Sequence, residues 1–403
     1  MLSQLNYHES IADWLLQNEQ GVWDWFSNAK LQEEQNSETR DLLLKQTYRL
    51  SRETHGSAYE CCEAAMARLG VEAPVTLYQA GDGAMNAALF FIPGEIHIVL
   101  YGPILEKLSE IELTALFGHE LSHYLLWTLN ERRYRIAQQI IDDAVQQSAS
   151  EYALYETARL YLLSTEVFAD RGAVIAAGGP DAAIAVLLKV MTGLAATDPK
   201  AFLEQAAELD AKGEIAKNPS HPETYMRALF IDRWCRDSAK GTEGTEGTEG
   251  KGIDDWVLAK LKGPMAIGSL DLLDQNRLTV ITRQLFALLL HDSNLASPMV
   301  VTQIKQFFPD WQGEEEIRLD PEKLNELAQD RSIRDYMIAL LIDLAHADPD
   351  QTEEMLVRGG KFAASMDWED DYRDNLKSLL KMRKPQVDRI MRASEKVSWK
   401  VGG

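Results

Sequence analysis

The spacing of hydrophobic residues predicts a mostly helical protein with one short β region. Over most of the chain apolar residues recur every three or four positions, as they do on one face of an α-helix. The pattern changes after residue 74, where Val75–Gln79 is typical of a strand. Asn86–Ile92 and Glu95–Tyr101 then predict a hairpin that turns at Pro93-Gly94. We therefore expect a mainly α fold with a small β-sheet.

The signals that begin and end helices divide the rest of the chain. Ser109 and Glu112 have the spacing of a capping box, which predicts the start of a long helix there. Gly70 is a typical residue to end the helix before the β region. The predicted helices cover 8–26, Ser37 through Tyr48, 57–69, a stretch that begins at Ser109, 132–147, 150–177, 180–191, 199–211 and Ser220-His221-Pro222-Glu223 through Trp234.

A glycine-rich repeat interrupts the chain after the last of these helices. The triplet Gly-Thr-Glu occurs three times in a row from Gly241 and has no apolar residue to anchor it. Such a segment is typical of a flexible linker. We expect a first domain over 1–240, a linker over 241–252 and an all-helical, acidic second domain over 253–403, with apolar helices at 278–290 and 333–347.

Charge and cysteine content indicate which partners and which cellular compartment suit the protein. The chain has 403 residues, is 45% hydrophobic and carries a formal charge of −22, with a pI of about 4.8. This charge argues against binding to nucleic acid or to an anionic membrane surface. The three cysteines are Cys61, Cys62 and Cys235, an odd number that fits a reducing compartment. We expect a cytoplasmic protein, without a signal peptide in the first 25 residues and without a membrane span.

The candidate metal-binding and catalytic residues begin with the segment His119-Glu120-Leu121-Ser122-His123. Two histidines four apart on a helix lie on one face, so both imidazoles can bind one zinc ion. Glu120 points away from that face and is free to act as a base. A catalytic zinc needs a third protein ligand, and Glu166 is the candidate, with Asp170 one turn later. By spacing alone, Glu166 and Asp170 could equally form a solvated acidic face.

Together these motifs resemble the HtpX-type zinc metallopeptidases, the family that includes the CAAX prenyl endoproteases. His119-Glu120-Leu121-Ser122-His123 and Glu166-Val167-Phe168-Ala169-Asp170 are similar to its paired His-Glu-x-x-His and Glu-x-x-Ala-Asp motifs. The resemblance covers roughly residues 40 to 235. It extends, in the same order, to Asn86-Ala87, the helix start at Leu108–Leu113, and Ser220-His221-Pro222 with Arg227.

The resemblance implies a zincin-like α+β catalytic domain of the gluzincin type, and it assigns roles to residues. His119, His123 and Glu166 would bind zinc, Glu120 would be the general base, and Asp170 would support a zinc-bound histidine. His221 or Arg227 would stabilise the oxyanion; without the resemblance, His221 only begins a helix and Arg227 makes a surface ion pair. The strand with Asn86, Ala87 and Ala88 would pair with an extended substrate backbone.

The sequence also departs from this family, because many of its members have membrane helices that this chain lacks. We therefore expect a soluble zinc endopeptidase for proteins or peptides, with a second domain that regulates it or recruits a protein partner. Residues 343–350 faintly resemble TerB-like domains of tellurite resistance, although Pro349 stands where glycine is expected. These residues could equally form a solvated loop and not a metal-binding one. The alternatives are a silent zinc-binding interaction module and a latent enzyme whose second domain covers the cleft.

Overall fold

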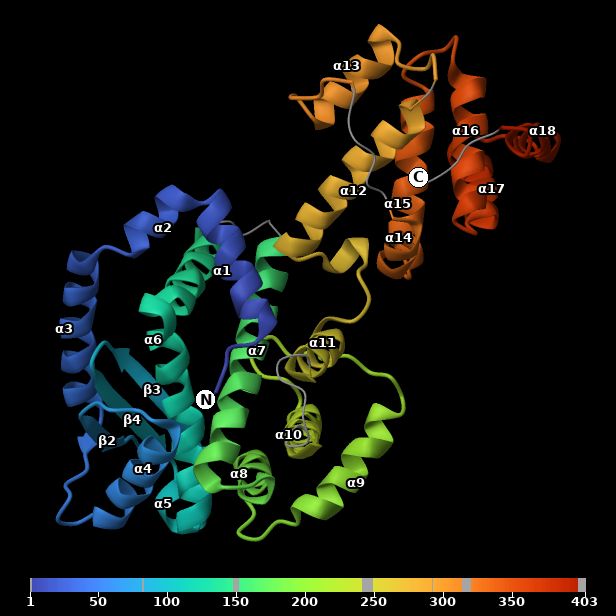
Figure 1. Ribbon diagram of the computed structural model, residues 1–403. Helices are drawn as coiled ribbons and strands as arrows, with labels where there is room; N and C mark the ends of the chain where they lie inside the picture. The colour runs from blue at the N-terminus through green and yellow to red at the C-terminus, as the bar shows by residue number, and fades with distance from the viewer. Residues whose placement is uncertain are drawn as a thin grey trace. The chain divides into compact units, whose positions relative to one another are not determined.

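The computed structural model describes residues 2–81, 83–147, 152–240, 249–291, 293–313 and 320–397. The chain divides into two compact units, Met1–Gly263 and Pro264–Gly403. Helices dominate both units, and the first also contains one small sheet (Figure 1). The predicted fold class, mainly α with a small β-sheet, is confirmed.

The sheet in the first unit has four strands in the order β1-β2-β4-β3. Its strands are β1 (Tyr48–Arg49), β2 (Val75–Gln79), β3 (Asn86–Ile92) and β4 (Glu95–Tyr101). β2 and β4 are parallel, whereas β3 and β4 form the predicted antiparallel hairpin. Strand β3 lies at an edge, so one side of its backbone is not paired within the sheet.

The first three helices differ from the prediction at their ends. The predicted helix over 8–26 is divided into α1 (Asn6–Asn18) and α2 (Gln20–Phe26), because the backbone at Glu19 leaves the helical region with φ −129° and ψ 39°. Helix α3 (Ala29–Gln46) ends before Tyr48, which pairs with Gln79 of the sheet. The prediction that this helix continues through Tyr48 was therefore wrong, since strand pairing overrides the local helical pattern.

Most of the remaining helices of the first unit begin close to their predicted positions, but the helices over 104–107 and 249–262 were not predicted. Helix α4 ends at Gly70, whose φ of +69° is the left-handed conformation that glycine adopts readily. The backbone N–H of Ser109 donates to Glu112, as the capping box predicted. The helices are α4 (Gly56–Leu69), α5 (Ile104–Lys107), α6 (Glu110–Gln147), α7 (Tyr152–Ala177), α8 (Pro180–Thr192), α9 (Pro199–Asp210), α10 (Thr224–Lys240) and α11 (Glu249–Lys262).

Helices α6 and α7 pass each other in very close contact. A Cβ atom added to Gly118 of α6 would lie 2.3 Å from the Cβ of Ala176 on α7. One added to Gly172 of α7 would lie 1.6 Å from the Oγ of Ser122 on α6. These distances are far below van der Waals contact, so only glycine fits at either position. The crossing brings together the stretches of α6 and α7 that carry the predicted ligands.

Helix α11 belongs to the first unit, although the sequence placed its residues partly in the linker and partly in a second domain beginning at 253. Arg171 of α7 donates from Nη2 to the Oδ1 of Asp254 at 2.6 Å, and both side chains are buried. Trp256 packs edge-on against Phe230 of α10. The compact units instead divide after Gly263. Most of the predicted linker, residues 241–248, lies outside the described residues.

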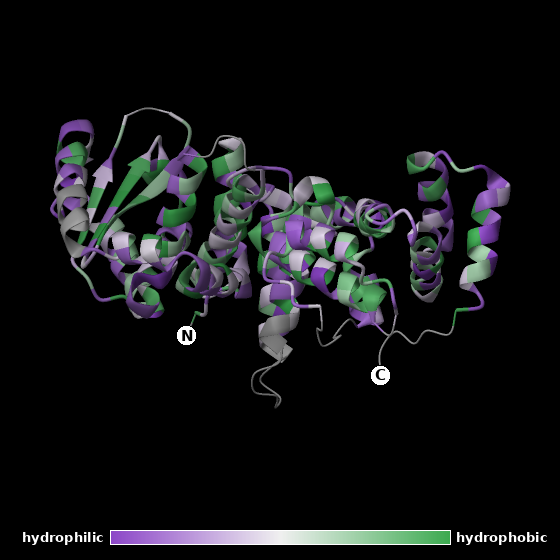
Figure 2. Cartoon of the chain, turned by 90° about the horizontal axis from the view of Figure 1, so that it is seen from above, coloured by the Kyte–Doolittle hydropathy of each residue, from purple (hydrophilic) through white to green (hydrophobic). Residues whose placement is uncertain are grey.

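The second unit has a hydrophobic core of its own, centred on Phe286, Trp311, Phe362 and Tyr372. Green apolar and purple polar bands alternate along the helices, as amphipathic packing requires (Figure 2). No helix in the described part of the chain is long and apolar enough to cross a membrane. The helices of this unit are α12 (Leu272–Leu290), α13 (Pro298–Phe307), α14 (Pro321–Leu327), α15 (Arg331–Ala345), α16 (Thr352–Ser365), α17 (Glu369–Leu379) and α18 (Lys384–Ser394).

Candidate functional site

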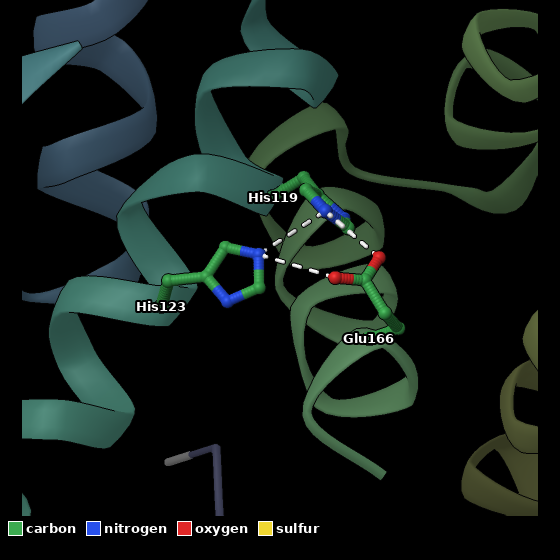
Figure 3. Close-up of side chains that lie close together, drawn as sticks. All are labelled: His119, His123 and Glu166. Atoms are coloured by element: carbon green, nitrogen blue, oxygen red, sulfur yellow. Dashed lines mark hydrogen bonds and ion pairs between the residues drawn. The ribbon is translucent and has the colours of Figure 1, made fainter. Parts of the chain in front are cut away.

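The two histidines of α6 and Glu166 of α7 converge on one point (Figure 3). Nε2 of His119 lies 3.3 Å from Nε2 of His123. The Glu166 carboxylate oxygens lie 3.5 Å from His119 Nε2 and 3.7 Å from His123 Nε2. One ligand atom from each residue lies within 4.8 Å of the others, so this group could hold a metal ion.

The chemistry of the three groups fits a metal, because one buried oxygen among them accepts no hydrogen bond from the described residues. Oε2 of Glu166 is buried and accepts no hydrogen bond within the described part of the chain. The guanidinium of Arg227, 3.3 Å away, balances part of its charge, and a bound metal ion would supply the direct contact that this oxygen lacks. Two imidazole nitrogens and one carboxylate oxygen are also a common ligand set for catalytic zinc.

Asp170 and Arg227 form a second layer behind the ligands. Asp170 Oδ1 lies 3.1 Å from His119 Nδ1, as expected of a residue that supports a ligating histidine. Arg227 of α10 donates to both carboxylate oxygens of Asp170, at 2.8 and 2.6 Å. Its Nη2 also lies 3.3 Å from Glu166 Oε2. Arg227 is nearly buried here, so its interpretation as a surface ion pair was wrong.

Burial and the charge of Arg227 act in opposite directions on the two carboxylates. Burial alone raises the pKa of Asp170, but the charge and hydrogen bonds of Arg227 hold it well below the ordinary range. The pKa of Glu166 is also lowered overall, because Arg227 and the nearby histidines outweigh the burial. Both groups therefore carry a negative charge at neutral pH.

The residues of the His-Glu-x-x-His motif titrate differently from one another. Burial lowers the pKa of His123 to about 4, so this ring is neutral and one of its two nitrogens has a lone pair for a metal. Burial acts the same way on His119, but the hydrogen bond to Asp170 raises its pKa overall. Glu120 is 5% exposed, and burial raises its pKa to about 7. These three residues line the same cavity.

That cavity is a cleft of about 600 Å³ beside strand β3. Asn86, Ala87, Ala88 and Leu89 line one side of it. The backbone of Leu89 lowers the pKa of the Glu120 carboxyl, and both residues line the cleft, so the edge of the strand lies beside the motif. An extended peptide could pair with such an edge, in the manner of an added β-strand.

Comparison with known proteins identifies this part of the chain. Residues 57–234 match the family described as Peptidase family M48. These residues form an M48 peptidase domain. The resemblance to the HtpX-type peptidases is thereby confirmed, and the M48 domain includes the cleft and all the residues around the predicted ligands.

One curated relative is similar to part of the chain. The chain is 30% identical over 201 residues to a protein of Arabidopsis thaliana named "Plastoglobule-localized metallopeptidase 48, chloroplastic". The match covers 45% of this chain and 56% of that relative, so the chain spans little more than half of the relative's length. No solved structure is significantly similar to the chain.

His221 lies at the mouth of the M48 cleft, in the loop before α10. Its Nε2 is 3.5 Å from Oε1 of Glu166, and 59% of its side chain is exposed. Its Nδ1 lies 2.9 Å from the Oγ of Ser220. The structure therefore brings His221 and Arg227 to the same site, but of the two side chains only that of His221 is exposed enough for a substrate to contact it.

Two further residues of the M48 cleft, Trp127 and Gln138, were missed by the sequence analysis. The indole ring of Trp127 lies against the ring of His123, with 5.6 Å between the ring centroids. Gln138 lines the cleft beyond it. Trp127 stands one turn after His123 and could have been singled out by that spacing, but the sequence contains no signal for the approach of Gln138.

Proposed function

We propose that this chain is a zinc-dependent metalloendopeptidase. The observation that supports the proposal most strongly is the convergence of His119, His123 and Glu166 beside a cleft large enough for a peptide. The M48 domain supports a metallopeptidase, and a fourth position facing solvent is what zinc catalysis needs. When bound, zinc would polarise the scissile carbonyl and lower the pKa of water.

Each residue around the cleft then has a role in the proposed reaction. Glu120 takes a proton from the attacking water and passes it to the leaving amine. His221 donates a ring N–H to the oxyanion, because its side chain is exposed to the cleft. Arg227 is committed to Asp170, so we assign it to holding the Asp170 and Glu166 carboxylates in place. The free edge of β3 at Asn86, Ala87 and Ala88 pairs with the substrate backbone.

The direct test is cleavage of an unfolded, fluorescently labelled protein by the full chain. We expect cleavage with zinc, its loss after chelation, and its recovery when zinc is returned. Glu120→Gln should abolish cleavage and still bind zinc, whereas Glu110→Gln, an exposed change on the same helix, should cleave at the normal rate. Normal cleavage by Glu120→Gln would refute the assignment of the base.

The second unit has a compact core of its own, and the peptidase motifs lie outside it. We propose that it regulates the enzyme or recruits a protein partner. Its acidic loop at residues 346–350 is folded by its own hydrogen bonds, with the N–H of Asp350 donating to Asp348. Among the described residues that loop contributes no group that could hold a metal ion. The cytoplasmic location stays a prediction from the cysteines.

A further inference from the structure

Helix α8 presents one apolar face to the cleft. Five of its residues line the cavity, and they follow the i, i+3, i+4, i+7, i+8 spacing that places residues on one side of a helix. The cavity therefore has an apolar wall along the length of α8. These residues are Ala183, Val186, Leu187, Val190 and Met191.

A buried ion pair fixes the orientation of this face. Nζ of Lys189 donates to Oε2 of Glu112 at 2.8 Å and to the backbone carbonyl of Lys107 at 3.1 Å. The side chains of Lys189 and Glu112 are only 8% and 12% exposed. Rotation of α8 about its axis would separate a buried charge pair, which is strongly unfavourable. The apolar face is therefore held towards the cleft.

Helices α6 and α7 complete the same apolar region. Leu116 lies one turn before His119 on α6, and Ala173 follows Asp170 on α7. Both line the cleft, and both pack in one hydrophobic cluster with Ala183 and Val186 of α8. The apolar region thus begins directly beside the two helices that carry the metal group.

We propose that this region is a subsite for a bulky apolar side chain of the substrate, such as leucine, methionine or phenylalanine. The proposal rests on the peptidase function proposed above and adds the class of peptide that the cleft selects. Met191 stands at the rim, 53% exposed, where a flexible thioether can adapt to side chains of different shape. A substrate side chain bound here would cover Leu187 and Val190, which the protein's own core leaves partly exposed.

Binding to the full-length Glu120→Gln variant tests the subsite without relying on cleavage. The probes are zinc together with fluorescent ten-residue peptides of glycine and serine, in which one position is leucine or glutamate. Moving that position along the peptide allows for an unknown register. We expect the best leucine peptide to bind about tenfold more tightly than its glutamate counterpart, the effect of burying one apolar side chain.

Two exposed residues of similar size provide a matched pair of variants. Met191 lines the cleft, whereas Leu194 does not, and they are 53% and 56% exposed. In the Glu120→Gln background, Met191→Asp should remove most of the preference for leucine, and Leu194→Asp should keep it. Because both residues are exposed, neither change should prevent folding. Leu187→Ala should weaken binding of the leucine peptide and leave binding of the glutamate peptide unchanged.

The subsite is overturned if leucine and glutamate peptides bind equally, or if Met191→Asp and Leu194→Asp give the same preference. A failure of the peptidase proposal gives a different result. In that case the active chain with zinc would leave the bound leucine peptide intact, while the preference for leucine and its dependence on Met191 would still be measured.

Discussion

The indole N–H of Trp127 donates to Oε1 of Gln138 at 2.9 Å, across a bend in helix α6. Asn130, Glu131 and Arg132 form the bend with φ values of 49°, 57° and 67°, which residues other than glycine adopt rarely. Because of the bend, Gln138 in the second half of α6 reaches the indole of Trp127, which lies against the ring of His123. Nδ1 of His123 is buried and has no hydrogen-bond partner in the described structure. Packing against Trp127 thus orients His123, as the contact with Asp170 orients His119.

We predict that Trp127→Leu weakens zinc binding about 10- to 100-fold, the usual cost of losing a group that orients a metal ligand. Gln138→Leu should have a smaller effect in the same direction, because the indole remains but is no longer held. Competition with a fluorescent chelator measures the zinc affinity. Trp25→Leu, a change at a tryptophan that is 55% exposed, is the control. Equal zinc affinity in Trp127→Leu and Trp25→Leu would contradict this role.

The crossing of α6 and α7 predicts a second effect on the metal group. Gly172→Ala would place a Cβ atom against Ser122 and push the two helices apart. We expect a loss of about 1–3 kcal/mol in the free energy of unfolding, together with weaker zinc binding. Urea unfolding and zinc titration measure the two effects. Gly21→Ala is the control, since a Cβ there meets open space. Wild-type zinc affinity in Gly172→Ala would show that the close crossing does not position the ligands.

The sequence was sufficient to predict those parts of the fold that depend on local patterns. Strands β2, β3 and β4 have their predicted bounds, because alternation and the Pro93-Gly94 turn are properties of neighbouring residues. The end of α4 at Gly70 was predicted for the same reason. His119 and His123 could be paired from the helical repeat alone, whereas pairing them with Glu166 required the family resemblance.

Features that depend on distant contacts were not predictable in this way. Tyr48 forms a strand only because Gln79 lies beside it in the sheet. Of the left-handed residues 130–132, only asparagine has a local preference for that conformation, so the sequence does not indicate three such residues in a row. Nor does the sequence show that Asp254, beyond the glycine-rich repeat, pairs with Arg171 of α7.

Burial of His8 predicts how stability depends on pH. Burial lowers the pKa of His8 to about 3, and its Nε2 lies 3.1 Å from the hydroxyl of Thr165. An unfolded histidine titrates near pH 6.5, so between these values the unfolded chain binds a proton that the folded chain does not. Stability should therefore fall as the pH falls below 6.5, by about 2 kcal/mol between pH 7 and 5 from this residue.

Urea unfolding of the wild type and of His8→Gln at several pH values tests this dependence. Glutamine can still hydrogen-bond to Thr165 but does not titrate. The wild type should lose about 2 kcal/mol more than His8→Gln between pH 7 and 5. Parallel curves for the two proteins would mean that the pKa of His8 is the same in the folded and unfolded chain, which would contradict the effect of burial.

The pair between Arg171 and Asp254 predicts that α11 stabilises the first unit. Asp254→Asn leaves a buried guanidinium without its charged partner, and we expect it to cost about 3–5 kcal/mol. Asp255→Asn is the neighbouring control on the same helix. Thermal unfolding of the full-length variants measures the difference. Equal unfolding temperatures for the two variants would show that the pair contributes little.

The same pair determines where the chain can be shortened to test latency. A chain that ends after residue 240 lacks α11 and should unfold more readily, so a loss of its activity would say nothing about the second unit. A chain that ends after Gly263 keeps α11. If the second unit restrains the enzyme, this shorter chain should cleave faster than the full chain; an unchanged or lower rate at equal folded concentration would count against latency.

The metal content of the purified full-length chain tests the central claim most directly, when it is measured beside that of Glu166→Ala. Two imidazoles and one carboxylate should bind zinc in a ratio of one ion to one chain, and removing the carboxylate should leave a folded protein that loses zinc during dialysis. Equal zinc content in Glu166→Ala and the wild type after dialysis would show that Glu166 is not a ligand and would contradict the proposed peptidase site.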